Sequence, residues 1–416
     1  MELFHIFSGV LALSAVLSFI NQKYIRLPSG IALMLAGMIL SLVIQGIGLL
    51  SPEFYTLVTE SLESLDFSAF VLEFILSFLL FAGSLHTDFD KLAKAKWAIM
   101  SFASLGVIVS TFLVGTLLYY GLQLFGNPID YIYCLLFGAL ISPTDPIAVL
   151  GILKKAGVPD QVKAKITGES LFNDGIGVVV FLTIFQIARK GLEQVETSYI
   201  VELLVMEIIG GIGLGLLLGF LGFQLLRRIN HYQTEVMITL AIVMGGYSIA
   251  QIFHFSGPLA MVASGLFIGN SEDRGAMSDI TADYVHKFWE MIDEILNAVL
   301  FVLIGLELLL VPFSYTYVIL GILATAISLA SRYMALALPT YTLKLYKTFA
   351  PNTLGIMTWG GLRGGISIAL ALSLDPGMEK ELIVAITYAV VLFSLIVQGL
   401  TLERMVKRLA AKPIVE

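Results

Sequence analysis

The chain has 416 residues, of which 58% are hydrophobic and only 13% are charged, and its mean hydropathy is +0.92. Soluble globular domains carry about 25% charged residues, so this composition excludes an ordinary soluble domain and indicates a membrane protein. The net charge is −7, and the basic residues are not gathered into a patch. Nucleic-acid binding therefore has no support. The single cysteine, Cys134, excludes an intramolecular disulfide and a cysteine-based metal site.

Apolar segments long enough to cross a bilayer recur along the whole chain, since a spanning helix needs roughly 20 mostly apolar residues. The first of them is expected to be a spanning helix and not a cleaved signal peptide, because Lys23 and Arg26 follow the apolar run instead of preceding it. The predicted spans are 4–20, 28–50, 66–86, 95–121, 129–153, 164–188, 199–226, 232–254, 256–270, 286–311, 315–343, 352–374 and 380–403. We therefore expect an all-α polytopic membrane protein with about 13 transmembrane helices.

The Lys and Arg residues agree with this number of spans. If the N-terminus lies outside and the spans alternate, 19 of the 24 bases fall in inside segments or at the inner ends of the adjoining spans. Three fall outside, and two, Arg332 and Arg363, fall deeper within spans. Cytoplasmic loops of membrane proteins carry such an excess of positive charge. The segment 51–65 is acidic and is expected to be an outer loop. The pattern thus predicts a cytoplasmic C-terminus.

The chain reads as one transmembrane domain, 1–404, followed by a short cytoplasmic tail, 405–416. An odd number of spans allows spans 1–6 and spans 8–13 to form inverted six-helix repeats joined by the seventh, a common transporter architecture. Span five, 129–153, then pairs with span twelve, 352–374. Both contain Pro or Gly clusters in mid-span, which predicts that both helices are interrupted.

Span five carries Thr144 and Asp145 between Pro143 and Pro146. Proline removes a backbone donor and clashes with the preceding turn, so the helix is expected to unwind and free carbonyl groups. Carbonyl, hydroxyl and carboxylate oxygens are the ligands that a hard cation prefers. The alternative is a kinked helix with a structural Asp145.

Span six carries two carboxylates in the string Gly168-Glu169-Ser170-Leu171-Phe172-Asn173-Asp174-Gly175. Residues four apart share a helical face, so Ser170 lies beside Asp174, and Glu169 lies beside Asn173. Both carboxylates cannot stay ionised and unpaired at this depth. The alternative, a capping arrangement at a helix start, suits Glu169, but Asp174 lies too deep for it.

Two bases and several further acids also fall within spans, where ionisable groups are costly and mark pathways or partners. Arginine keeps its charge and needs a carboxylate or several carbonyls. We expect Arg363 to pair with Glu169, and Arg332 has no assigned partner. Glu73 is expected either to face the cavity as an outer ligand or to pack between helices and snorkel.

The acids of span ten carry a weaker signal. Asp293 and Glu294 fit a solvated helix end better than a funnel that attracts cations. Glu307 receives no assigned role. The sequence alone therefore leaves the role of Glu307 open.

Four stretches resemble the NhaP/NHE branch of the cation–proton antiporters, in its prokaryotic form: SPTDPIAV at 142–149, GESLFNDG at 168–175, Ser256–Leu266 and Trp359–Gly365. The resemblance implies the NhaA-like antiporter fold, with spans five and twelve broken and crossed near an ion site. It also implies a homodimer that works by alternating access in the prokaryotic plasma (inner) membrane.

The resemblance also implies roles for individual residues. Asp174 would hold Na⁺ and H⁺ alternately, and the Na⁺ site would be completed by Ser170, Asp145 and the carbonyl of Thr144, with Glu73 contributing in some members. Thr144 and Asn173 would brace the crossing, and Glu169 and Arg363 would form an internal ion pair. Electrogenic relatives carry two consecutive aspartates where this chain has Asn173 and Asp174. One H⁺ per Na⁺ is therefore expected.

The expected function is electroneutral exchange of Na⁺, or Li⁺, for H⁺, in the service of pH homeostasis and without a cofactor. A K⁺/H⁺ antiporter stays open, because cavity size and ligand geometry decide cation selectivity. A cation channel lined by carboxylates is the alternative of a different class. An enzyme is not expected, because Gly168-Glu169-Ser170 lacks the second glycine of a hydrolase nucleophile elbow.

Overall fold

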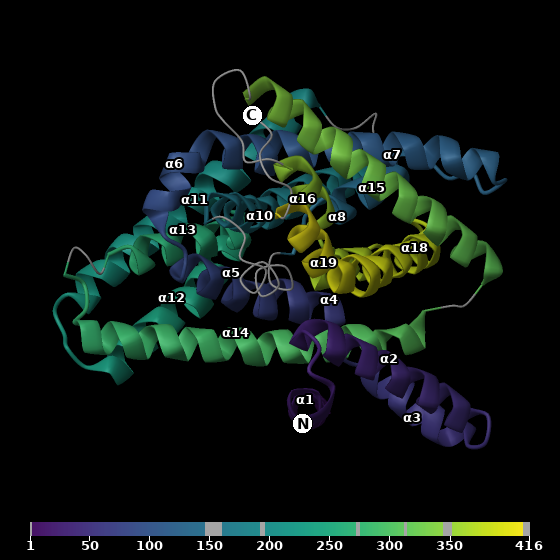
Figure 1. Cartoon of the computed structure of the whole chain (residues 1–416), viewed down its shortest axis with the longest axis horizontal. Coiled ribbons are helices and arrows are strands. Elements are labelled where there is room, and N and C mark those ends of the chain that lie inside the picture. Colours follow the sequence, from purple (N-terminus) through teal and green to yellow (C-terminus); the bar gives the residue numbers. More distant parts are fainter. Residues whose placement is uncertain are drawn as a thin grey trace.

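The computed structural model describes residues 2–145, 160–191, 196–271, 275–311, 314–343 and 352–410, and this part of the chain is helical, with no β-strand. Figure 1 shows long helices crossing at different angles. The α-helices and the shorter π- and 3₁₀-helices (η) are α1 (Glu2–Ile20), η1 (Asn21–Ile25), α2 (Ser29–Gly48), α3 (Pro52–Glu63), α4 (Phe67–Ala69), η2 (Phe70–Ile75), α5 (Leu76–Leu85), α6 (Phe89–Met100), η3 (Ser101–Leu105), α7 (Gly106–Leu124), α8 (Tyr131–Ile141), α10 (Asp160–Lys190), α11 (Thr197–Leu226), α12 (Tyr232–Ile252), α13 (Gly257–Gly269), α14 (Asp279–Glu307), η6 (Leu308–Leu310), α15 (Tyr315–Leu343), α16 (Thr353–Trp359), α17 (Gly365–Leu372), α18 (Lys380–Phe393), η7 (Ser394–Gln398) and α19 (Gly399–Ala410).

The predicted spans coincide with helices throughout the described residues, so the expected fold class is confirmed. Nine of the described helices are long and apolar enough to cross a membrane, and two shorter apolar helices, α8 and α13, fall on predicted spans. Residues 146–153 of the predicted fifth span lie outside the described residues. At the C-terminal end, α19 continues the last span as far as Ala410, into the predicted tail.

The segment predicted as an outer loop, 51–65, is mostly helical, which the charge pattern alone did not indicate. Pro52 occupies the first turn of α3, where its missing N–H costs no hydrogen bond. Tyr55, Val58 and Leu62 follow at helical spacing and turn towards the protein. The Tyr55 hydroxyl donates to the carbonyl of Leu309 at 3.4 Å. The segment is therefore a short amphipathic helix that packs on α2 and contacts η6 through Tyr55.

Helix packing supports the inverted-repeat arrangement. If each span of the first half corresponds to the span seven places later, α2 corresponds to α13, and α5 corresponds to α14. The contact between α2 and α14 then corresponds to the contact between α13 and α5, and both contacts are present. The pair α7 and α8 likewise corresponds to α15 and α16, and both pairs are in contact. The two halves are thus built to one plan.

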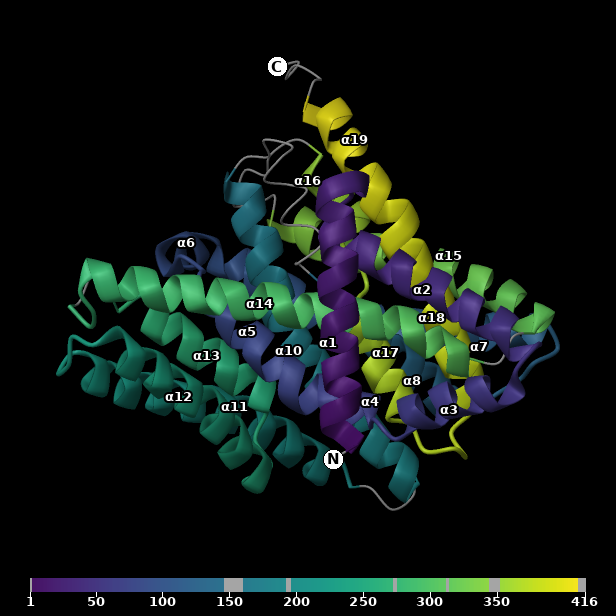
Figure 2. The same ribbon diagram turned by 90° about the horizontal axis from the view of Figure 1, so that it is seen from below.

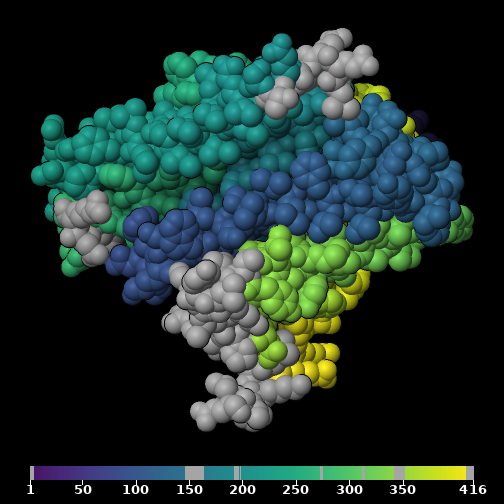
Figure 3. All heavy atoms as spheres, turned by 90° about the horizontal axis from the view of Figure 1, so that it is seen from above, coloured from purple at the N-terminus to yellow at the C-terminus, as the bar shows by residue number. Residues whose placement is uncertain are grey.

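The seventh span, α11, lies with α12 and α13 on one side of the molecule (Figure 2). On another face α15 runs along α7, one span from each half (Figure 3). The exposed large hydrophobic side chains include Ile209 and Phe220 of α11, and Ile322 of α15. Exposed apolar side chains of this kind are expected on helices that face the hydrocarbon core of a bilayer.

Both helices predicted to be interrupted end in mid-span. Helix α8 stops at Ile141, and residues 142–145 continue without helical structure. In span twelve, α16 and α17 are separated by the non-helical residues 360–364. The N–H of Asp145 donates to the carbonyl of Leu362 at 2.8 Å, so the two interruptions meet. Span twelve is therefore discontinuous and meets the end of α8 at its break, whereas the second half of span five lies outside the described residues.

Candidate ion-binding site

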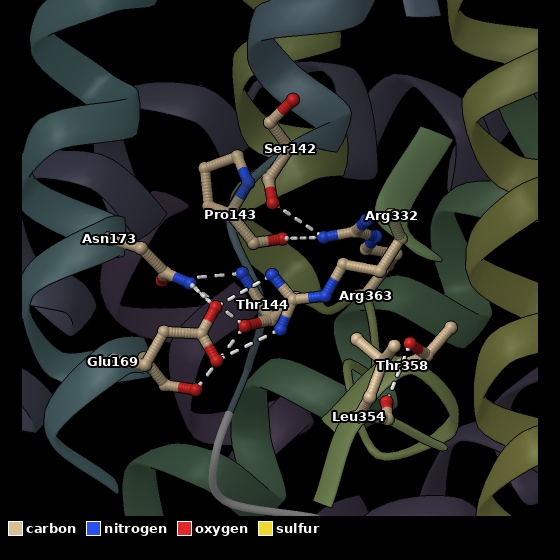
Figure 4. Close-up of polar contacts among 10 residues, drawn as sticks. Ser142, Pro143, Thr144, Glu169, Asn173, Arg332, Leu354, Thr358 and Arg363 are labelled. Atoms are coloured by element: carbon tan, nitrogen blue, oxygen red, sulfur yellow. Dashed lines mark hydrogen bonds and ion pairs between the residues drawn. The ribbon is translucent and has the colours of Figure 1, made fainter. Parts of the chain in front are cut away.

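Arg363 ties the two interruptions together through backbone carbonyls (Figure 4). Its Nη1 donates to the carbonyls of Ser142 and Pro143, each at 2.6 Å, and its own N–H donates to Ser394 Oγ at 2.9 Å. Carbonyls at a helix C-terminus have no partner within the helix and carry partial negative charge. A buried arginine satisfies them with the fork of donors that it carries.

The predicted pairing of Arg363 with Glu169 is wrong, because Glu169 pairs with Arg332 of α15. Arg332 Nη1 lies 2.6 Å from Glu169 Oε1, and Nη2 lies 2.9 Å from Oε2. Both side chains are buried, with exposed fractions of 4% and 1%. Arg363 is engaged by the backbone carbonyls that the break in span five leaves free. Arg332 is the arginine that neutralises the Glu169 carboxylate.

Asn173 joins this ion pair to the break in span five. Its Nδ2 donates to Thr144 Oγ1 at 2.9 Å and to Glu169 Oε1 at 3.1 Å. Its Oδ1 accepts from the N–H of Thr144 at 3.3 Å. The contact expected between Asn173 and Thr144 is thus present. Thr144 Oγ1 also lies 3.3 Å from Ser170 Oγ, so Ser170 belongs to the same network.

Close backbone approach at the crossing requires glycine at particular positions. A Cβ on Gly364 would collide with the Asp145 carboxylate, and one on Gly177 would collide with the ring of Pro143. A Cβ on Gly361 would lie 2.8 Å from Arg332 Nε. The Gly-rich strings therefore let three chain segments pack against each other at the carboxylates.

A cavity of about 220 Å³ opens beside the crossing. Its wall is mostly aliphatic, from α5, α10, α14 and α17, and it contains the three carboxylates Asp145, Asp174 and Asp293. The side chains of Asp145 and Asp174 are buried, with 9% and 4% exposed. Within the described part of the chain, Asp174 makes no hydrogen bond or ion pair. Its oxygens are therefore available to a cation or a proton that enters the cavity.

The remaining predicted site residues lie at different distances from this cavity. Ser170 and Thr144 are buried and contact each other beside it. Glu73 borders a second pocket of about 400 Å³, together with Ser77 of α5 and Tyr247 of α12. The structure does not bring Glu73 to the cavity of Asp174, so its role as a ligand stays a prediction.

Asp293 is the cavity residue that sequence reasoning placed elsewhere. The charge pattern favoured a solvated helix end for it and for Glu294. Glu294 is exposed, as expected, but Asp293 is half-buried and borders the cavity. A signal was present in the sequence, because Asp293 and Leu300 are seven residues apart and so share one face of a helix.

Breaks in two spans that meet beside buried carboxylates are typical of secondary transporters. The transmembrane sodium/hydrogen exchanger family matches residues 10–408. The chain is 47% identical to the Na⁺/H⁺ antiporter NhaP of Pseudomonas aeruginosa, over 97% of this chain and 96% of that protein. It is 35% identical to the Na⁺/H⁺ antiporter NhaH of Halobacillus dabanensis, over 93% of each.

Among solved structures, the sodium proton antiporter MjNhaP1 of Methanocaldococcus jannaschii has the same fold. It superposes with a TM-score of 0.77 at 19% identity, over 99% of this chain and 100% of that chain. The chain belongs to the sodium/hydrogen exchanger family.

Proposed function

We propose that the protein exchanges Na⁺ for H⁺ by alternating access, with the two ions competing for Asp174. The observation that carries this proposal is a buried carboxylate that lines a cavity without a protein partner among the described residues. Relatives such as those of P. aeruginosa and H. dabanensis are named Na⁺/H⁺ antiporters. Family membership and geometry therefore support the same transport reaction.

Competition at one carboxylate explains why the two fluxes are coupled. Asp174 with Na⁺ or with H⁺ is close to neutral, whereas the bare carboxylate would meet a barrier of several kcal/mol in moving through a low-dielectric region. Asp145 supplies a second carboxylate to the same cavity. In the proposed site, Ser170 and the carbonyl of Thr144 complete the oxygen ligands of Na⁺. Glu169, Arg332 and Asn173 hold the surrounding backbone.

The test is proton flux in proteoliposomes that contain the purified protein. Na⁺ or Li⁺ added outside the vesicles is expected to drive protons out of them, opposite to the movement of the cation, because both ions take oxygen ligands of this type. A larger response to K⁺ would replace this proposal by K⁺/H⁺ exchange. Currents well above transporter rates would indicate a cation channel. An inactive preparation with every cation would contradict exchange altogether.

We infer that exchange is electroneutral, with one H⁺ per Na⁺. Asn173 occupies the position next to Asp174, carries no charge, and is engaged with Thr144 and Glu169. The buried Glu169 is neutralised by Arg332. The initial rate at fixed ion gradients is therefore expected to stay the same when valinomycin and K⁺ set the membrane potential to different values. A rate that follows the potential would contradict a 1:1 stoichiometry.

The remaining assignments concern the setting of the transporter. The distribution of Lys and Arg supports an N-terminus outside and a C-terminus in the cytoplasm. We assign the protein to the prokaryotic plasma membrane as a homodimer with a role in pH homeostasis. Resemblance to the antiporter family supports these assignments.

A further inference from the structure

Span three changes its helical period where it passes the ion cavity. It runs as α4, then as the π-helix η2 from Phe70 to Ile75, and then as α5. At the end of η2 the N–H of Leu76 donates to the carbonyl of Val71, five residues back, instead of to that of Leu72, four residues back. One turn of the span therefore contains an extra residue. Single π-turns within α-helices are frequent at functional sites.

The extra residue decides which cavity Glu73 borders. Leu76 and Leu80 line the cavity that contains Asp174. In an unbroken α-helix Glu73, three residues before Leu76 and seven before Leu80, would share their face. The wider turn of η2 rotates Glu73 away from that face, and it borders the second pocket. A Glu73 carboxylate at the ion cavity therefore requires η2 to become α-helical.

Tyr247 of α12 binds the carbonyl that the π-helix releases. Its hydroxyl donates to the carbonyl of Leu72 at 2.6 Å, and Leu72 is the acceptor that Leu76 would use in an α-helix. A carbonyl in the membrane interior is costly without a partner, so this hydrogen bond stabilises the π-form. The Tyr247 ring is held in place by Gly257 at the start of α13, where a Cβ would lie 2.5 Å from the ring.

The two ends of span three differ in their freedom to move. After η2, α5 packs closely on α13, since a Cβ on Gly269 would collide with the carbonyl of Leu85. Glu73, in contrast, is exposed, and within the described residues its carboxylate makes no hydrogen bond or ion pair. Conversion of η2 to an α-helix would therefore leave α5 in place and turn the segment before it by up to about 100°, the rotation of one residue.

We propose that Tyr247 is a positioning residue that keeps Glu73 out of the ion cavity by holding η2 in its π-form. When the Leu72 carbonyl leaves Tyr247, η2 becomes α-helical and Glu73 turns towards the cavity of Asp174, where its carboxylate adds an oxygen ligand to the bound cation. This inference rests on the proposed Na⁺/H⁺ exchange. It makes the affinity for the cation depend on α12, a helix that contributes no residue to the wall of that cavity.

The test is the KM for Na⁺ in proteoliposomes. For Tyr247→Phe, which removes only the hydroxyl, the KM is expected to fall about two- to tenfold, the shift in a conformational equilibrium that one hydrogen bond produces. The effect passes through Glu73, so Tyr247→Phe in a Glu73→Gln background should leave the KM of that background unchanged. A purely structural role of Tyr247 would lower activity in both backgrounds alike.

Ser248→Ala is the matched control, because Ser248 borders the same pocket and its hydroxyl donates to the carbonyl of Met244 within its own helix. It should leave the KM unchanged. Gly257→Ala displaces the Tyr247 ring without altering Tyr247, so it is expected to lower the KM in the same direction. Size-exclusion profiles in detergent show whether each variant is folded, and Gly257→Ala keeps the test valid if Tyr247→Phe is not.

Two results would overturn the role of Tyr247. One is a KM for Tyr247→Phe that is unchanged or raised relative to the unmodified protein. The other is a fall of the same size in the Glu73→Gln background, which would separate Tyr247 from Glu73. Inactivity of the unmodified protein would instead refute Na⁺/H⁺ exchange itself, so the two failures are distinguishable.

Discussion

Replacing Asp174 with asparagine is expected to abolish Na⁺-driven proton flux while the protein still inserts and folds. The two side chains have nearly the same size, and Asp174 makes no hydrogen bond or ion pair within the described residues that the change would break. Asparagine can neither take up a proton nor neutralise Na⁺. Loss of several kcal/mol of ion stabilisation lowers the rate at least ~100-fold. Proton flux in proteoliposomes measures this loss.

The matched control for this change is Asp90→Asn, an equivalent substitution at an exposed position in the first turn of α6. It is expected to retain the flux of the unmodified protein. The thermal unfolding midpoint of Asp174→Asn in detergent should be no lower than that of the control, because the change removes repulsion with the neighbouring Asp145. Residual exchange by Asp174→Asn at a rate close to the control would refute Asp174 as the exchanging group.

Breaking the pair of Glu169 and Arg332 is expected to destabilise the protein more than any other single loss of an ion pair described here. Arg332 cannot give up its charge, so Glu169→Gln leaves an uncompensated cation in the interior. Removing one partner of a buried pair costs about 3–5 kcal/mol. The thermal unfolding midpoint in detergent is expected to fall sharply, and the yield of folded protein should fall with it.

Arg189 and Asp375 provide the comparison, because their distance of 2.7 Å is similar but their side chains are 58% and 41% exposed. Exposed pairs contribute about 0–1 kcal/mol, so Arg189→Gln should barely move the midpoint. The double variant Glu169→Gln with Arg332→Gln should be less destabilised than the sum of its single changes. Equal midpoints for Glu169→Gln and Arg189→Gln would show that the buried pair does not support the fold.

The helical framework could be predicted from the sequence because lipid imposes a simple rule on each span separately. Length and apolar content identify a spanning helix without knowledge of its neighbours. The proline pair around Asp145 and the glycines around Arg363 likewise indicate interruptions by local chemistry alone. Helix α3 was missed because its apolar residues are few, and its charges dominated the interpretation of the segment.

The site was predictable where one helix brings its own residues together, and less so where distant helices meet. Spacing of four along α10 placed Ser170 beside Asp174 and Glu169 beside Asn173. The partner of Glu169, in contrast, lies 163 residues away. Two intramembrane arginines were equally plausible from the sequence, and no pattern within either segment distinguishes them. Asp293 was placed wrongly for a related reason. The cavity that it borders is closed by residues of α10 and α17, which are distant in the sequence.

The bonds at the crossing also determine which parts can move independently. Arg363 holds the end of α8 by two carbonyls, and Asp145 is joined to Leu362 through the backbone. These hydrogen bonds connect residues 142–145 to residues 360–364, so the two non-helical segments are expected to move together. Rearrangements that open the cavity first to one face and then to the other must therefore carry the crossing along intact.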